Sequence, residues 1–251
     1  MSNTPTVVLV HGAFADASSY APVVRRLLDE GVTVVAPPSA NRSLASDAGY
    51  IASVVSQIDG PVLLVGHSYG GAVVTVAGNE SNVVGLVYLA AYVLAEGESL
   101  GELQNRFAPS PLGEALVYTP YPIEGSSEPG TDVSVDIARF PSIFAAEVDP
   151  ALTKVLAVSQ RPLAAAAFGE PAVGAPAWAQ KPAWGIVASA DQAINPDVQR
   201  FGYERAGASV IEVDSSHLVM HAHPDAVVAV IRDALASVTA AQNEPVGSSA
   251  L

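Results

Sequence analysis

Short runs of apolar residues alternate along this chain with segments whose apolar residues recur every three or four positions. The apolar runs predict buried strands at residues 6–10, 32–36, 61–65, 83–89, 183–188 and 208–213. The periodic segments predict helices at residues 19–30, 43–58, 68–77, 195–206 and 224–238. Buried strands that alternate with helices are typical of a parallel sheet covered on both faces. We therefore predict an α/β fold with a mostly parallel sheet of about six strands.

This alternation stops near Ala95 and resumes near Pro182. The residues between them are rich in proline and show no buried strand, and only residues 150–168 predict a helix, with an interruption at Pro162. A structureless connection of this length is uncommon within a domain. We therefore predict a lid inserted at residues 95–181, a core formed by residues 1–94 and 182–240, and a flexible tail at residues 241–251.

The sequence Gly66-His67-Ser68-Tyr69-Gly70 joins the third predicted strand to the helix that follows. A G-x-S-x-G sequence at such a junction forms a sharp, strained turn that exposes the serine. The residues two before and two after the serine are pressed together, so glycine is required at both places. The short pattern also occurs by chance in glycine-rich chains, and its value here comes from the strand before it and the helix after it. We predict that Ser68 is a nucleophile.

Open α/β sheets place their functional residues at the carboxyl ends of the strands. The candidates at these ends are His11-Gly12-Ala13-Phe14, Ser68, Asp191 and His217. The chain order serine, aspartate, histidine is the order expected of an α/β-hydrolase. With these motifs, the chain from about Thr6 to Leu235 resembles the α/β-hydrolase superfamily. Within it, the chain resembles the small-lid branch that contains bacterial carboxylesterases, plant methylesterases and hydroxynitrile lyases; the other matching residues are Gly71, Ile194-Asn195-Pro196 and Ser216.

The resemblance implies a serine hydrolase that needs no cofactor. In that reading Ser68 attacks the substrate, His217 is the general base, and Asp191 orients the histidine ring and stabilises its charged form. An oxyanion hole would combine the backbone N–H of Tyr69 with that of Ala13 or Phe14. The tentative substrate pocket comprises His11, Gly12, Tyr92, Phe144 and Leu218, although Tyr92, Phe144 and Leu218, like Phe107, Phe140 and Trp178, could equally belong to the core.

The other histidines have structural interpretations. We expect His11 to shape its loop, His67 to be packed and hydrogen-bonded within the turn, and His221 and His223 to be solvated or to cap a helix. Asp214 could be an ordinary loop carboxylate. Apart from the weak cluster of His217, His221 and His223, the histidines lack the spacing of metal ligands, so we predict no metal site.

Composition restricts the partners of the chain. Of its 251 residues, 50% are apolar and 14% are charged, which suits one large domain with a sizeable core. The net charge of −14 disfavours nucleic acid, and no apolar run reaches the roughly 18–20 residues of a membrane span. The first residues show no signal-peptide pattern, and the lack of cysteine excludes disulfides and thiolate catalysis. We expect a cytoplasmic monomer or homodimer that acts on a small-molecule ester and binds neither nucleic acid nor membrane.

The leading functional prediction is a serine carboxylesterase that cleaves small to medium uncharged esters or lactones. Hydroxynitrile lyases of the resembled branch need a lysine directly after the triad histidine, and this chain has Leu218 there. That difference favours hydrolysis over the lyase reaction. A cofactor-free perhydrolase and a receptor-like ligand-binding protein with vestigial hydrolysis share the scaffold, and both alternatives stay open at this point.

Overall fold

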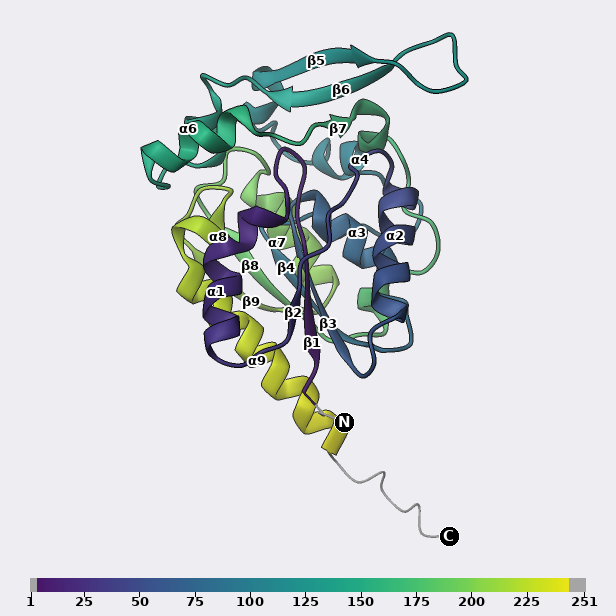
Figure 1. Ribbon diagram of the computed structural model, residues 1–251, viewed down its shortest axis with the longest axis vertical. Coiled ribbons are helices and arrows are strands. Elements are labelled where there is room, and N and C mark those ends of the chain that lie inside the picture. Colours follow the sequence, from purple (N-terminus) through teal and green to yellow (C-terminus); the bar gives the residue numbers. More distant parts are fainter. Residues whose placement is uncertain (1–3, 244–251) are drawn as a thin grey trace.

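A computed structural model describes residues 4–243 of the chain, and its centre is a parallel sheet of six strands (Figure 1). The strands lie in the order β2-β1-β3-β4-β8-β9, and every neighbouring pair is parallel. This arrangement confirms the predicted α/β fold. The strand bounds are β1 (Thr6–Val10), β2 (Val34–Val35), β3 (Val62–His67), β4 (Val83–Leu89), β8 (Ala183–Ala188) and β9 (Ser209–Val213).

Helices cover both faces of this sheet. The helices α1 and α9 pack against each other on one face, and α2 and α3 pack together on the other (Figure 1). The four inner strands are therefore buried almost throughout, as their continuous apolar runs predict. The helices of this core are α1 (Ala21–Asp29), α2 (Leu44–Ser56), α3 (Tyr69–Ala77), α7 (Pro196–Arg205), α8 (Val219–Ala222) and α9 (Pro224–Asn243), with a 3₁₀ turn, η1 (Ala17–Tyr20), before α1.

Both ends of the sheet and the end of the last helix differ from the sequence prediction. The predicted strand at 32–36 shortens to β2, and β9 is an exposed edge strand, with Val210 and Ile211 42% and 43% exposed. Its apolar run therefore does not mark burial, because an edge strand is covered from fewer sides. Helix α9 continues to Asn243, so residues 241–243 of the predicted tail are helical, and residues 244–251 lie outside the described part of the chain.

The 95–181 segment lies across the carboxyl ends of the main strands (Figure 1). It contains a second sheet, antiparallel and three-stranded in the order β5-β6-β7, which the sequence analysis did not predict. No helix within residues 4–243 is long and apolar enough to cross a membrane. The elements of the segment are α4 (Leu100–Gln104), η2 (Pro111–Ala115), β5 (Leu116–Tyr121), β6 (Gly130–Val135), α5 (Phe140–Phe144), α6 (Pro150–Val158), β7 (Leu163–Ala164), η3 (Ala165–Phe168) and η4 (Ala177–Ala179).

The helix predicted at 150–168 stops at Val158, which corrects the sequence prediction. Just beyond it, the amide of Gln160 accepts a hydrogen bond from the Val135 N–H and donates one to the Val135 carbonyl, both at 2.8 Å. Pro162 then disfavours helical backbone at the residue before it. These two features explain why the chain extends into β7 and pairs with β6 instead of continuing the helix.

Candidate active site

Ser68 occupies a strained turn between β3 and α3. Its backbone has φ 55° and ψ −123°, a region that residues other than glycine rarely adopt. Hydrogen bonds to the end of β4 and beyond hold it there: the Ser68 N–H donates to the Leu89 carbonyl at 3.1 Å, and the Ser68 carbonyl accepts from the N–H groups of Gly71 and Tyr92. The surrounding backbone therefore fixes the strained conformation that the sequence predicts.

Glycines around this turn allow backbone segments to approach closely. A Cβ atom on Gly66 would lie 2.5 Å from the Gly70 carbonyl oxygen, and one on Gly70 would lie 2.4 Å from the Val10 carbonyl oxygen. Both distances are too short for non-bonded atoms, so the predicted need for glycine at 66 and 70 is confirmed. Gly12 has a similar role, because a Cβ there would lie 2.7 Å from the Cβ of Ser68.

Asp191 and His217 form a fully buried pair at the ends of β8 and β9. Nδ1 of His217 and Oδ2 of Asp191 are 2.7 Å apart. The other carboxylate oxygen, Oδ1, accepts hydrogen bonds from the N–H groups of Ala193 at 2.7 Å and Ile194 at 3.0 Å. These donors stabilise a negative charge on the carboxylate, and a carboxylate held in this way can orient a histidine ring and stabilise an imidazolium.

Gln199 is a further partner of this pair that the sequence analysis missed. Its side-chain nitrogen donates to Oδ2 of Asp191 at 2.8 Å, and its oxygen accepts from the Ala188 N–H at 3.0 Å. The residue is completely buried on the inner side of α7, beside Val198. The sequence gives only a weak signal for this hydrogen bond to Asp191. The signal is a polar residue at a buried position of the helix that follows the candidate acid.

Three contacts hold the loop that carries His217. The Ser216 N–H donates to both carboxylate oxygens of Glu147 at 2.9 Å, and the Leu218 N–H donates to the Phe144 carbonyl at 3.0 Å. On the other side, Nε2 of His67 lies 3.0 Å from the His217 carbonyl and must donate to it, since a carbonyl oxygen only accepts. Burial keeps the pKa of His67 well below its usual value, so this ring stays neutral.

Ser68 and His217 line the same cavity, which has about 300 Å³ of space not filled by protein atoms, the open solvent at its mouth included. Nε2 of His217 is buried there, and among residues 4–243 it has no hydrogen-bond partner, Ser68 included. The tentative pocket residues Tyr92 and Phe144 line this cavity. The remaining lining residues are Ala13, Phe14, Tyr69, Leu100, Leu112, Leu163, Phe168, Ala193 and Ile194.

His11 and Gly12, which directly follow β1, do not lie in the pocket to which the sequence assigned them. The Ser39 N–H donates to Nε2 of His11 at 2.8 Å, so the proton of this ring is on Nδ1, which donates to the Gly12 carbonyl. Burial lowers the pKa of His11 and favours this neutral form. His11 therefore shapes the loop, and neither it nor Gly12 lines the cavity, which corrects their assignment to the pocket.

The structure also narrows the candidates for the oxyanion hole. The N–H of Phe14 donates to the carbonyl of Arg161 at 2.9 Å, so it is engaged with the 95–181 segment. Of the two amides considered in this loop, that of Ala13 therefore remains the candidate to act with the amide of Tyr69, the residue after Ser68. The Tyr69 hydroxyl donates to the buried carboxylate of Asp47 at 2.8 Å, which anchors the start of α3.

Comparison with known proteins identifies the family. The sequence pattern of the alpha/beta hydrolase family matches residues 7–230. The chain belongs to this family. This α/β hydrolase has no match among curated proteins.

Several solved structures share the fold of this α/β hydrolase. Polyneuridine aldehyde esterase is 18% identical with a TM-score of 0.79, and the alignment covers 92% of this chain and 99% of that one. A pyrethroid hydrolase from Sphingobium faniae JZ-2 is 21% identical with a TM-score of 0.73, covering 93% and 98%. A methylesterase from Arabidopsis is 19% identical with a TM-score of 0.74, covering 93% and 99%. At these identities the comparison establishes a common fold.

The remaining candidates of this α/β hydrolase are not in the lining of the Ser68 cavity. Asp214 is exposed at the end of β9, and Leu218 lines a neighbouring cavity. His221 is in the short helix α8, where burial lowers its pKa, and His223 follows that helix. Within the described residues, no three His, Cys, Asp or Glu side chains are grouped so that they could hold a metal ion.

Proposed function

We propose that this α/β hydrolase is a serine carboxylesterase that cleaves small to medium uncharged esters or lactones. The observation that carries the proposal is the buried Asp191–His217 pair, whose ring lines the same cavity as Ser68. Nucleophile, base and orienting acid follow three different strands, and the sheet brings their loops to one edge. This is the arrangement that acyl transfer through a serine requires.

In the proposed reaction, the Ser68 hydroxyl attacks the carbonyl carbon of the ester while Nε2 of His217 takes its proton. The amides of Tyr69 and Ala13 stabilise the negative oxygen of the tetrahedral intermediate. When the intermediate collapses, the bond to the alcohol oxygen breaks, and His217 returns the proton to the leaving alcohol. A water molecule, deprotonated by His217, then hydrolyses the acyl-enzyme and releases the acid.

The lining of the cavity supports uncharged substrates. Within residues 4–243, no Asp, Glu, Lys or Arg side chain lines it, and most of the lining is aliphatic or aromatic. Such a surface favours apolar acyl groups over charged ones. Leu218 lies where a hydroxynitrile lyase of the resembled branch would need lysine, and it is buried, which favours hydrolysis over the lyase alternative. Two of the structural neighbours are named as esterases.

A covalent label tests the proposal. A p-nitrophenyl phosphonate should modify the protein once, and mass spectrometry of its peptides should place the adduct on Ser68. Ser68→Ala should abolish both labelling and hydrolysis of p-nitrophenyl acetate. Its melting temperature should equal that of the parent. Ser189→Ala and Ser216→Ala are matched controls that should keep both properties. Labelling of either control serine, or turnover by Ser68→Ala, would contradict the assignment.

A further inference from the structure

A second cavity adjoins the one that contains Ser68. Phe14 and Phe144 line both cavities, and their rings meet edge to face with centroids 5.8 Å apart. These two rings therefore form the boundary between the cavities. The second cavity has about 320 Å³ of space not filled by protein atoms, the open solvent at its mouth included, and neither the proposed triad nor the oxyanion hole uses it.

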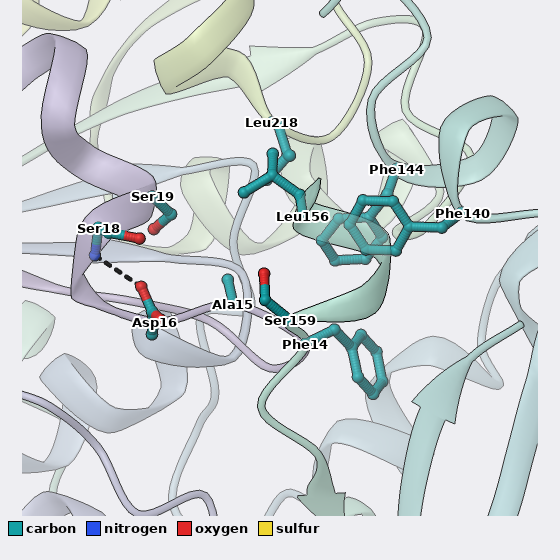
Figure 2. Close-up of a pocket in the computed structure, with 10 residues that line it drawn as sticks. All are labelled: Phe14, Ala15, Asp16, Ser18, Ser19, Phe140, Phe144, Leu156, Ser159 and Leu218. Atoms are coloured by element: carbon teal, nitrogen blue, oxygen red, sulfur yellow. Dashed lines mark hydrogen bonds between the residues drawn. The ribbon is translucent and has the colours of Figure 1, made fainter. Parts of the chain in front are cut away.

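The walls of this second cavity are divided by chemistry. Figure 2 shows Asp16, Ser18 and Ser19 together on one side, and the aromatic and aliphatic side chains on the other. The apolar side contains Phe14, Phe140, Phe144, Leu156 and Leu218, and Ser159 lies among them with its hydroxyl donating to the Val155 carbonyl at 2.8 Å. Such a surface suits a ligand that has a ring or alkyl group at one end and polar atoms at the other.

Ser19 adds a hydroxyl, unpartnered in the described part of the chain, to the polar side of this cavity. It is only 3% exposed, and its hydroxyl has no hydrogen-bond partner within residues 4–243. A buried hydroxyl without a partner is costly, so native structures usually satisfy it. Beside it, Oδ1 of Asp16 accepts one hydrogen bond, from the Ser18 N–H at 2.7 Å. A carboxylate can accept several more, so this corner favours a ligand that donates hydrogen bonds.

The charges around the cavity favour a ligand that donates hydrogen bonds over a ligand that carries a carboxylate. Asp16 is the charged residue in the described lining, and it would repel a ligand carboxylate. Arg161 also acts on the Asp16 carboxylate, but its side chain is exposed and it does not line the cavity. Water screens an exposed guanidinium, so the field of Asp16 dominates inside the cavity.

The position of the cavity relative to His217 indicates which half of an ester it would hold. The rings of Phe144 and His217 meet edge to face, with their centroids 4.5 Å apart. Leu218, which lines the second cavity, directly follows the histidine. In the proposed reaction the alcohol oxygen receives its proton from His217, so the alcohol half leaves on the side of the histidine. The second cavity lies on that side, behind the Phe14–Phe144 boundary.

We propose that the second cavity binds the alcohol half of the substrate and selects alcohols or phenols that carry a hydroxyl or amino group on an apolar frame. The frame packs on Phe140, Phe144 and Leu218, and the polar group donates to Asp16 and Ser19. Alcohols that carry a carboxylate are disfavoured. This inference rests on the proposed esterase function for its assignment to the alcohol half, whereas ligand binding itself can be measured without catalysis.

Binding of three phenols of similar size tests the cavity directly. By isothermal titration, tyramine should bind more tightly than 4-ethylphenol, and 4-hydroxyphenylacetate should bind most weakly. Asp16→Asn should reduce the advantage of tyramine over 4-ethylphenol by roughly tenfold, the effect of one charge-assisted hydrogen bond. Asparagine replaces aspartate well as a helix cap, so the fold should be retained. Asp59→Asn, an exposed site with the same change of charge, should leave the advantage unchanged.

Ser19→Ala is the second variant. It removes a hydroxyl that has no partner in the described structure, so a purely structural role predicts unchanged or slightly higher thermal stability and unchanged affinities. The proposal predicts weaker binding of tyramine by several-fold with 4-ethylphenol unaffected. Equal affinity for the three phenols, or an advantage of tyramine that survives both Asp16→Asn and Ser19→Ala, would overturn the inference.

Hydrolysis of the acetate esters of the same phenols separates the two proposals. All three form the same acetyl-enzyme, so differences in kcat/KM report on the alcohol half alone. The expected order of kcat/KM is that of the phenol affinities, with loss of the order in Asp16→Asn. If Ser68→Ala hydrolyses the acetates, the proposed function is wrong. The affinities of the three phenols would still show whether the second cavity binds the proposed ligands. If wild-type hydrolysis depends on Ser68 but shows no preference sensitive to Asp16, the alcohol-site inference alone fails.

Discussion

Nδ1 of His217 lies 2.7 Å from Oδ2 of Asp191, although 26 residues separate them in the chain. The reason is the parallel pairing of β8 with β9, in which Ala188 lies opposite Val213. Parallel neighbours end at the same edge of the sheet, so the loops that follow them meet. The Asp191–His217 pair is buried and hydrogen-bonded, so replacing either residue should have a measurable effect on turnover.

Asp191→Asn should retain substrate binding and lose turnover. An amide cannot stabilise the imidazolium and favours the wrong tautomer of His217, so kcat should fall by up to about 10⁴-fold, as in the serine-protease triad. Steady-state kinetics with p-nitrophenyl acetate measures the change. The control is Asp214→Asn, at an exposed position, which should behave like the parent. Loss of turnover in the control, with normal turnover in Asp191→Asn, would move the acid to Asp214.

Gln199→Leu should reduce kcat by roughly tenfold with little change in KM, because the Asp191 carboxylate loses one hydrogen bond that supports its charge. The variant also leaves the Ala188 N–H without its partner, so the melting temperature should fall. Gln192→Leu, at an exposed position in the same loop region, is the matched control and should change neither quantity. A lower melting temperature with unchanged kcat would show that Gln199 has only a structural role.

His217→Gln should lose acylation, because glutamine cannot take the proton of Ser68. His221→Gln and His223→Gln should stay within a few-fold of the parent, since the structure places neither residue in the lining of the Ser68 cavity. A pre-steady-state burst with p-nitrophenyl acetate reports acylation directly. Normal acylation in His217→Gln, together with its loss in either of the other variants, would show that the base is misassigned.

Gly70→Ala should lower both stability and kcat. Its Cβ would lie 2.4 Å from the Val10 carbonyl oxygen, so β1 or the Ser68 turn must shift, and the amide of Tyr69 would shift with it. Gly49→Ala in α2 is the matched control, because among residues 4–243 no atom outside its chain neighbours and its own helix backbone lies within 4 Å of the new Cβ. Alanine should stabilise that helix by up to about 1 kcal/mol. The melting temperature should therefore fall in Gly70→Ala and rise in Gly49→Ala, whereas kcat should fall in Gly70→Ala and stay unchanged in Gly49→Ala.

The free energy of unfolding should decrease as the pH falls below about 6.5, the usual pKa of histidine. Burial lowers the pKa of His67 well below that value, and it also lowers the pKa of His11. Just below pH 6.5 the unfolded chain therefore binds protons that the folded chain does not, and each such group contributes a slope of up to about 1.4 kcal/mol per pH unit.

Urea unfolding at several pH values between 5.5 and 7.5 measures this slope, and His67→Gln should make it shallower. The glutamine amide can still donate to the His217 carbonyl, so the variant should remain folded. An equal free energy of unfolding at both ends of the pH range would contradict the assignment of a neutral, buried His67.

Features that depend on local physics are predictable from the amino-acid sequence. Continuous apolar runs predict the inner strands, because a parallel sheet covered on both faces has no polar side. The turn at Ser68 is predicted because glycine is the residue type that fits both Gly66 and Gly70, and the measured close approaches agree. The order of strands and helices then places Ser68, Asp191 and His217 at one edge of the sheet, which the topology confirms.

Features that join residues far apart in the chain became evident only in the folded protein. The apolar pattern of β9 does not reveal that it lies at an edge, since burial depends on what covers a strand. The amide of Phe14 is engaged because Arg161, 147 positions later, presents its carbonyl to it. The contacts of Gln199 with Asp191 and of Glu147 with Ser216 likewise depend on packing between separate elements. Hydrogen bonds of this kind follow no sequence period, because their partners meet only after the fold has formed.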